Sequence, residues 1–146
     1  MRPGKIYPIA HSPTAFVRST ITAVPAGFPS PADDHLEDPV DLIEQLVPNR
    51  MASFLWRIEG RSMEGGSIFD GDFAIVDRSI TPRNGHIVVA VIDGGCTIKQ
   101  LRYRNGTPTL IAIPALGKPY KFLPNQPFEI WGVVRHTVTS HLKRGE

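Results

Sequence analysis

The pattern of apolar and polar residues changes near residue 50, and the two parts of the chain predict different structures. After this point the apolar residues gather in short runs of strand length, separated by glycine, proline, aspartate and asparagine. Two of these separators, Asp93-Gly94-Gly95 and Asn105-Gly106, are typical of tight hairpin turns. We expect strands at residues 54–58, 73–76, 86–92, 96–103, 109–113 and 130–138. Strands at this spacing, joined by tight turns, predict a mainly β, largely antiparallel domain.

Before residue 50, proline dominates the pattern. Six of the 14 prolines lie within the first 31 residues, and proline both lacks a backbone N–H and blocks a helix. We therefore expect an extended or irregular N-terminal arm. One short helix is expected after it, because Val40, Ile43 and Val47 recur at helical spacing. Asp38 can cap this helix, and Pro39 suits its first position.

The composition fits one ordinary globular domain. The 146 residues and the 41% hydrophobic content are those of a protein with a single core. Cys96 is the single cysteine of the sequence, which excludes an intramolecular disulfide and a multi-cysteine zinc site and fits a reducing compartment. No apolar run approaches the roughly 18 residues of a membrane span, and no apolar stretch follows Arg2 and Lys5 as in a signal peptide. We expect a soluble, cytoplasmic protein without a membrane partner.

Charge is distributed unevenly along the chain. The net charge is only +2, which by itself does not indicate a nucleic-acid-binding protein. Residues 1–26 contain Arg2, Lys5 and Arg18 and no acidic residue, whereas the remainder is slightly acidic. A basic arm therefore precedes an acidic body. This pattern fits a solvated tail as well as an arm that lies on another surface.

No motif predicts a metal or another cofactor. The five histidines show no ligand spacing, and no glycine-rich phosphate-binding loop is present in the sequence. Asp70, Asp72 and Asp77 lack the glycine-and-glutamate pattern of a calcium loop, so we interpret them as a polar turn that leads into a strand. No GxSxG motif marks a nucleophile. Cys96, at the start of a predicted strand, is interpreted as a small buried apolar group.

Ser62 lies in a glycine-rich segment, residues 60–66, directly after the first predicted strand. Glycines allow the backbone to approach another chain closely and expose its N–H groups. A serine in such a segment can attack a carbonyl carbon while nearby N–H groups stabilise the oxyanion. Local composition alone favours an ordinary Gly-Ser loop, so both interpretations stay open here.

Lys99 lies inside the strand predicted at residues 96–103, on the same face as Leu101. Apolar surroundings disfavour the ammonium form of a lysine, because burial penalises the charge. A neutral amine beside a serine can act as a general base, which is the Ser-Lys variant of triad chemistry. A surface lysine on an exposed strand face fits the same pattern.

Five segments occur in a recognisable order along the chain. They are the Ala-Gly-Phe-Pro-Ser-Pro-Ala sequence of residues 26–32, Gly-Arg-Ser-Met at residues 60–63, residues 68–77, Thr-Ile-Lys at residues 97–99, and residues 130–134. Together they resemble the LexA/UmuD class of self-cleaving Ser-Lys peptidases, and the first segment resembles the cleavage site of UmuD-type proteins. The resemblance covers residues 25 to 138.

The resemblance implies a nucleophile and a base. Ser62 is expected to be the nucleophile and Lys99 its general base, with the backbone N–H groups of Ser62 and Met63 as oxyanion donors. The scissile bond is expected to be Ala26–Gly27, where Ala26 replaces the cysteine of UmuD proteins. The implied fold is a compact, largely antiparallel LexA/UmuD-like peptidase domain at residues 27–146, with one short helix. An extended N-terminal arm, residues 1–26, is expected to be removed by self-cleavage.

The resemblance also implies partners. It predicts a homodimer whose cleavage is stimulated by RecA filaments on single-stranded DNA during the SOS response. The shortened dimer is then expected to act as an accessory subunit of a Y-family, error-prone translesion DNA polymerase. Two alternatives stay open: a LexA-like repressor core or phage regulator with the same peptidase domain, and a polymerase-binding module that does not cleave.

The sequence weighs against a DNA-binding repressor and a signal peptidase. A LexA-type repressor needs a helix-turn-helix domain before its cleavage site, and only 26 proline-rich residues precede Gly27. A signal peptidase shares the Ser-Lys chemistry but needs a membrane anchor, which the sequence does not show. We therefore favour the UmuD-type function.

Overall fold

The computed structural model describes residues 2–9, 16–20, 26–28, 36–123 and 126–142, and the chain divides into two compact units. The first unit contains Met1–His11 and Asn49–Glu146, and the second contains Ser12–Pro48. The residues expected to carry out catalysis therefore belong to the first unit. The expected cleavage site belongs to the second.

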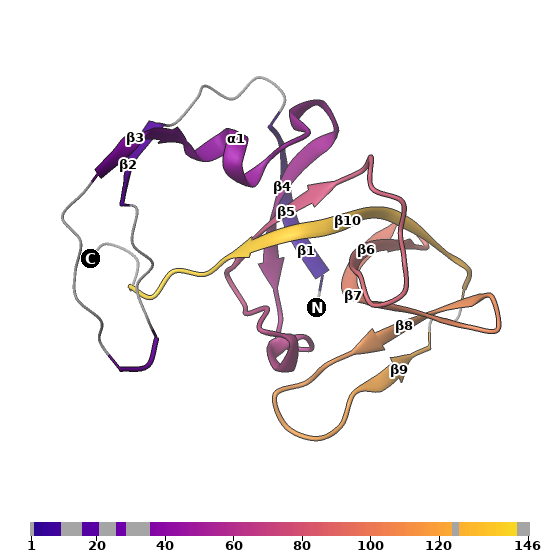
Figure 1. The fold of residues 1–146 in the computed structure, drawn as a ribbon. Helices are drawn as coiled ribbons and strands as arrows, with labels where there is room; N and C mark the ends of the chain where they lie inside the picture. The colour runs from indigo at the N-terminus through magenta and orange to yellow at the C-terminus, as the bar shows by residue number, and fades with distance from the viewer. Residues whose placement is uncertain (1, 10–15, 21–25, 29–35, 124–125, 143–146) are drawn as a thin grey trace. The chain divides into compact units, whose positions relative to one another are not determined.

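The first unit is built on one eight-stranded sheet in which all neighbouring strands are antiparallel (Figure 1). The strand order is β1-β4-β5-β10-β6-β7-β8-β9. Two short 3₁₀ helices, η1 (Arg50–Ala52) and η2 (Glu64–Gly66), lie on either side of β4 in the sequence. The strands are β1 (Arg2–Pro8), β4 (Ser53–Glu59), β5 (Phe73–Asp77), β6 (Ile87–Ile92), β7 (Gly95–Arg104), β8 (Thr107–Ala112), β9 (Tyr120–Phe122) and β10 (Phe128–Val138).

Buried apolar side chains cover both faces of this sheet. Successive residues of a strand point to opposite faces, so Val88 and Ala90 of β6 enter one core cluster and Val89 enters the other. The first cluster consists of Trp56, Ile58, Met63, Ile68, Ala74, Val76, Val89 and Ile98. The second consists of Val88, Ala90, Leu101, Leu110 and Val133. All of these residues lie in the first unit.

The mainly β, largely antiparallel fold expected from the sequence is confirmed. All six predicted strands are present, as β4, β5, β6, β7, β8 and β10. The short strand β9 lies in the proline-broken stretch before residue 130, where no strand was expected. Strands β1 and β2 lie in the proline-rich arm, and the structure joins β1 to the main sheet.

The second unit contains the strand pair β2 (Phe16–Thr20) and β3 (Leu36–Asp41), followed by the helix α1 (Leu42–Leu46). The prediction of one short helix is confirmed, but its predicted start was wrong. Asp38 and Pro39 belong to β3, and the helix is capped by Asp41 instead. The pairing of β3 with β2 extends to Asp41 and keeps the backbone extended as far as this residue.

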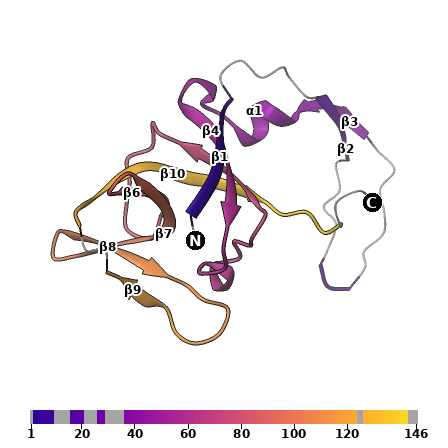
Figure 2. The ribbon, with the colours of Figure 1, turned by 180° about the vertical axis from the view of Figure 1, so that it is seen from behind.

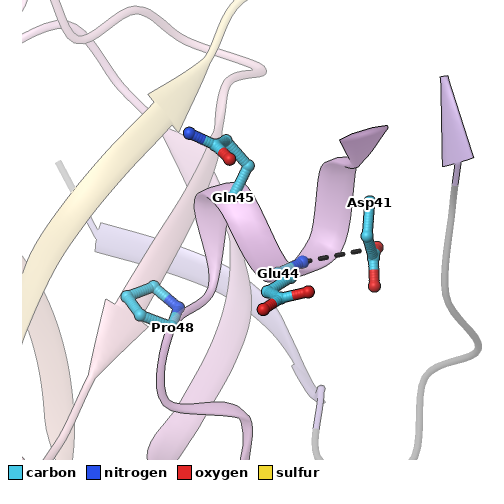
Figure 3. Close-up of a pocket in the computed structure, with 4 residues that line it drawn as sticks. All are labelled: Asp41, Glu44, Gln45 and Pro48. Carbon is cyan, nitrogen blue, oxygen red and sulfur yellow. Dashed lines mark hydrogen bonds between the residues drawn. The ribbon is translucent and has the colours of Figure 1, made fainter. Parts of the chain in front are cut away.

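The cap of α1 forms part of a pocket on the second unit (Figure 3). Asp41 Oδ1 accepts hydrogen bonds from the N–H groups of Ile43 at 3.0 Å and Glu44 at 3.4 Å. Glu44, Gln45 and Pro48 line the pocket together with Asp41. None of the site residues expected from the sequence lines it.

Candidate active site

Ser62 lies in the loop between β4 and β5, and buried neighbours hold this loop in place. Met63, the next residue, is 0% exposed, and Ile68 is 3% exposed. Both side chains belong to the first core cluster. At the base of the loop, the Gly60 N–H donates to Asp70 Oδ1 over 2.7 Å. Ser62 itself is half-buried, so its hydroxyl is positioned by anchored neighbours and is partly accessible.

The turn η2, which begins two residues after Ser62, packs against the chain that follows β8. The Gly65 N–H donates to the Ile113 carbonyl over 2.9 Å. A side-chain carbon at Gly65 would overlap the Pro114 carbonyl oxygen, so glycine is required at this position. The close approach fixes the Ser62 loop to the body of the first unit.

Strand β7 carries Lys99 into a buried position. Lys99 is 2% exposed and pairs across the sheet with Val88, a member of the second core cluster. Its Nζ lies 3.2 Å from Ser62 Oγ, 2.9 Å from Thr97 Oγ1 and 3.1 Å from the Ile98 carbonyl oxygen. Ser62 and Lys99, which are 37 residues apart in the sequence, are therefore in hydrogen-bond contact.

Burial changes the acid–base behaviour of Lys99. Desolvation lowers the pKa of its ammonium group from 10.5 to about 8. The aromatic ring of Phe122 in β9 lies beside the amine, with 4.9 Å between Nζ and the ring centroid. None of the described acidic side chains forms an ion pair with Lys99. A substantial neutral fraction of the amine is thus available just above neutral pH.

The hydrogen-bond partners of Lys99 suit both of its protonation states. An ammonium group has three N–H donors, and three oxygen atoms surround Nζ. A neutral amine has two donors and one lone pair. In that state Nζ can donate to Thr97 and Ile98 while its lone pair accepts the hydroxyl proton of Ser62.

The backbone next to Ser62 offers hydrogen-bond donors. The carbonyl of Met63 accepts hydrogen bonds from the N–H groups of Gly66 at 2.9 Å and Ile68 at 3.2 Å. The N–H groups of Ser62 and Met63 donate no backbone hydrogen bond to any other residue that the structure describes. These two donors, which lie beside the hydroxyl, can bind the oxygen of a substrate carbonyl.

The expected cleavage site is accessible. Ala26, Gly27 and Phe28 are all exposed, and Phe28 is 95% exposed. No atom lies within 4 Å of the position that a Cβ would occupy on Gly27. This segment belongs to the second unit, whereas Ser62 belongs to the first.

Thr97 and Phe122 were not identified from the sequence as site residues. Thr97 lies two residues before Lys99 in β7, so both side chains point to the same face of the sheet. The spacing of two residues within a predicted strand could therefore have identified Thr97 from the sequence as a neighbour of Lys99. Phe122 reaches Lys99 only through the pairing of β9 with β8, which no local pattern indicated.

Two aspartates that the sequence places in a polar turn before a strand, Asp72 and Asp77, have structural partners. Asp72 is 2% exposed, and its Oδ2 accepts the Phe69 N–H at 2.9 Å. Asp77 is 0% exposed and forms a 3.0 Å ion pair with Arg135.

Within the described ranges, no group of three or more histidine, cysteine or acidic residues could hold a metal ion. Cys96 is half-buried, and desolvation raises the pKa of its thiol.

No helix among the described residues is long and apolar enough to span a membrane.

The comparison with known proteins identifies relatives over most of the chain. Protein MucA of Salmonella typhimurium is 41% identical over 119 residues, or 81% of each chain. Protein ImpA of the same organism is 38% identical over 114 residues, or 77% of each chain. The LexA repressor of Clostridium novyi is 39% identical over 77 residues, which are 53% of this chain and 38% of the repressor.

A family profile covers the same region. The family described as Peptidase S24-like matches residues 19–135, a range that includes Ser62 and Lys99. With the similarity to MucA and ImpA, this match confirms the resemblance found in the sequence. The chain belongs to the Peptidase S24-like family and is a UmuD-type protein.

Proposed function

We propose that this protein is a serine endopeptidase that cleaves its own chain between Ala26 and Gly27. Ser62 acts as the nucleophile and Lys99 as the general base. The observation that carries the proposal is the 3.2 Å hydrogen bond between Lys99 Nζ and Ser62 Oγ. This bond joins a serine to a lysine that is only 2% exposed. Burial lowers the pKa of this lysine to about 8.

The first chemical step transfers one proton and forms one bond. The lone pair of neutral Lys99 takes the hydroxyl proton of Ser62, and Ser62 Oγ attacks the carbonyl carbon of Ala26. The carbonyl oxygen becomes an oxyanion. The backbone N–H groups of Ser62 and Met63 stabilise this charge, because both are available as donors.

The tetrahedral intermediate then collapses to an ester. The bond between Ala26 and Gly27 breaks, and the Lys99 ammonium donates its proton to the departing nitrogen of Gly27. The products of this step are an ester that joins Ser62 to Ala26 and a new amino terminus at Gly27. Lys99 is neutral again and ready for the second half of the reaction.

Water completes the cycle. Lys99 takes a proton from a water molecule, which attacks the ester carbonyl of Ala26. The second tetrahedral intermediate expels Ser62 Oγ, which regains its proton from Lys99. The final products are the fragment of residues 1–26 with a carboxylate on Ala26, the body of residues 27–146, and an intact Ser62.

The chemistry of the cleavage segment supports this assignment. Gly27 has no side chain and Ala26 a small one, so the backbone can come close to Ser62. The neighbouring prolines Pro25, Pro29 and Pro31 favour an extended chain, which is the form that a protease binds. The exposure of residues 26–28 leaves the scissile bond available for binding.

The family relationship supports a role in the SOS response. We propose that RecA filaments on single-stranded DNA stimulate the cleavage by favouring the productive pose of the arm. The shortened protein then acts as a homodimer and as an accessory subunit of a Y-family translesion polymerase. The similarity to MucA and ImpA, which extends over about four fifths of each chain, supports this role over a repressor core. The similarity to LexA extends over 53% of this chain.

A test of the activity uses the purified full-length protein. On incubation with activated RecA filaments, or alone at alkaline pH, intact-mass measurement is expected to show two products, residues 1–26 and 27–146. The Ser62→Ala protein is expected to stay intact under both conditions. A full-length protein that remains uncut would support the alternative of a polymerase-binding module without peptidase activity.

A further inference from the structure

Strand β1 occupies one edge of the main sheet. It pairs antiparallel with β4, in a register that places Arg2 opposite Glu59 and Pro8 opposite Phe54. Figures 1 and 2 show β1 alongside β4 from opposite sides. The pairing continues beyond β1, because the Ile9 N–H donates to the Ser53 carbonyl over 3.1 Å. Ile9 is 7% exposed, so its side chain also anchors the end of the strand.

The sequence of β1 suits the outermost position of a sheet. Pro3 and Pro8 lack the N–H group that a strand with two neighbours would need, and proline in a sheet is typical of edge strands. The register of β1 also shifts between Pro3 and Ile6, and such irregularities protect an edge against further pairing. Strand β1 therefore terminates the sheet.

Strand β4 lacks this protection. Its sequence, Ser-Phe-Leu-Trp-Arg-Ile-Glu, contains no proline or glycine. Its other neighbour is β5, with a continuous register from Ser53 to Arg57. Without β1, alternate backbone N–H and C=O groups of β4 would be unpaired along a regular edge. Such an edge binds extended peptides by adding a strand.

We propose that the edge of β4 is a peptide-docking site whose ligand is residues 2–9 of this chain, and that the cleaved fragment stays bound there until it dissociates. The inference rests on the proposed cleavage between Ala26 and Gly27. That bond lies between β1 and β4 in the sequence, so its hydrolysis removes the covalent link through residues 10–52 and leaves the strand pairing intact.

The cleavage changes the concentration dependence of this pairing. In the intact chain, residues 10–52 join β1 to β4, and such an intramolecular link gives an effective concentration on the order of 1 mM. After the cut, the effective concentration is that of free fragment. At about 1 µM free fragment, the ratio of bound to free β4 edge is therefore expected to fall about a thousandfold. Cleavage thus converts a permanent edge strand into a ligand that can leave.

The experiment follows the fragment after cleavage. The full-length protein is cleaved completely and passed through size exclusion at a series of concentrations, and the fragment of residues 1–26 is quantified by mass spectrometry. We expect it to elute with residues 27–146 at high concentration and to separate on dilution. In parallel, hydrogen exchange of residues 53–59 is expected to show protection in the intact chain. After cleavage and dilution, the amides that face β1 are expected to lose that protection by up to about a thousandfold.

Paired variants test the strand itself. The double change of Ile6→Pro and Tyr7→Pro removes two successive N–H groups, one of which faces β4 because alternate groups point to each side. This variant is expected to release the fragment at every concentration. The control, Ile6→Val with Tyr7→Phe, keeps both N–H groups and the strand-favouring side chains, and is expected to retain the fragment as the wild type does.

A second form of the protein separates this inference from the proposed function. In the Ser62→Ala protein, a recognition site for an added sequence-specific protease replaces residues 22–28, so the chain can be cut even if it does not cut itself. Retention of the fragment in this protein supports docking on β4, whatever cuts the chain. A fragment that elutes separately at all concentrations, or unchanged exchange of residues 53–59 after its release, would overturn the inference.

Discussion

Lys99 is unusual among lysines because it is buried without an acidic partner among the described residues. The three oxygens around its Nζ belong to two hydroxyl groups and one backbone carbonyl, all of them neutral. These oxygens replace the hydrogen bonds to water that Lys99 loses on burial, but they carry no negative charge that would favour the ammonium form. This environment explains the lowered pKa of Lys99. It reduces the stability of the fold and provides a reactive amine.

The first prediction concerns this cost. The unfolded chain, in which the lysine pKa is 10.5, binds more protons than the folded chain, whose Lys99 pKa is about 8. The burial of Lys99 therefore destabilises the fold fully below pH 8, and the penalty is relieved as the pH rises towards 10.5. The difference corresponds to about 3 kcal/mol as an upper bound. Lys99→Met is expected to raise the free energy of unfolding at pH 7 by up to this amount.

Denaturant unfolding of Lys99→Met and its parent at pH 7 and pH 10 measures this effect. Both proteins carry Ser62→Ala, so that self-cleavage does not interfere. The advantage of the methionine variant is expected to shrink at pH 10. A difference that is the same at both pH values would show that burial of the charge is not its source.

The second prediction concerns Gly27. Open space surrounds this residue in the second unit, so Gly27→Val is expected to leave the melting temperature unchanged. A β-branched side chain beside the scissile bond would displace the backbone from Ser62, and cutting is expected to slow by about 10- to 100-fold. The rate of appearance of the shortened chain measures this, with Gly27→Ala as the milder control.

N-terminal sequencing of the wild-type product is expected to give Gly27 as its first residue. A different first residue would contradict the assigned cleavage site.

At the scale of elements, the site depends on how the loop after β4 packs on the chain after β8. Gly65 and the Ile113 carbonyl are joined by a 2.9 Å hydrogen bond, and the adjoining carbonyl of Pro114 leaves no room for a side chain. The turn η2 thereby fixes Ser62 relative to the sheet that carries Lys99. Displacement of this turn would increase the distance between Ser62 Oγ and Lys99 Nζ.

The third prediction follows from this contact. Gly65→Ala places a methyl group against the Pro114 backbone, and such overpacking costs about 1–3 kcal/mol of stability. Self-cleavage is expected to slow as well, because the turn moves Ser62. The matched control is Gly66→Ala, whose added carbon would meet Ile113 Cδ1 at an ordinary 3.5 Å. Thermal unfolding and the rate of cutting are measured for both variants; equal effects of the two substitutions would rule out the packing argument.

The sequence predicted the elements with strong local signals. The six apolar runs bounded by turn residues all form strands, because each has the length and composition of a buried strand. Strand β9 has only three residues and depends on its pairing with β8, so no local pattern marked it. The helix is expected from the sequence to start at Asp38, because this residue can cap a helix and Pro39 suits its first position. The pairing of β2 with β3 instead keeps the backbone extended up to Asp41, which caps the helix.

The candidate site could be predicted only in part. Residue types alone allowed Ser62 and Lys99 to be ordinary surface residues, and the resemblance to known peptidases selected them. Their contact depends on a loop and a strand that are distant in sequence, since 37 residues separate the two side chains. Thr97 and Phe122 complete the surroundings of the amine, and Phe122 does so only through tertiary packing.

At the scale of the whole molecule, the two core clusters and the expected cleavage site belong to different units. All members of the two core clusters lie in the first unit, within residues 56–133. The segment around Gly27 lies in the second unit. Cleavage at this bond would leave every member of the two core clusters on one product, whereas the buried Ile9 lies on the other.

The fourth prediction concerns this product. A chain that starts at Gly27 is expected to fold, because both core clusters are retained. It is also expected to be a dimer, from the family relationship. Light scattering after size exclusion gives the mass, and circular dichroism gives the strand content. An unfolded or aggregated species would contradict the prediction that the arm is separable, and a folded monomer would contradict the predicted dimer.

The central claim is that Lys99 acts as a neutral base on Ser62, and the pH dependence of unassisted self-cleavage tests it most directly. With a Lys99 pKa of about 8, the cleavage rate of the full-length protein is expected to rise from neutral pH and to level off above about pH 9. Ser62→Ala and Lys99→Ala are expected to abolish cutting with the fold intact. Lys99→Arg is also expected to be inactive, because a guanidinium stays protonated. A Lys99→Ala protein that still cuts, or a wild-type rate that does not change from pH 7 to alkaline pH, would contradict the claim.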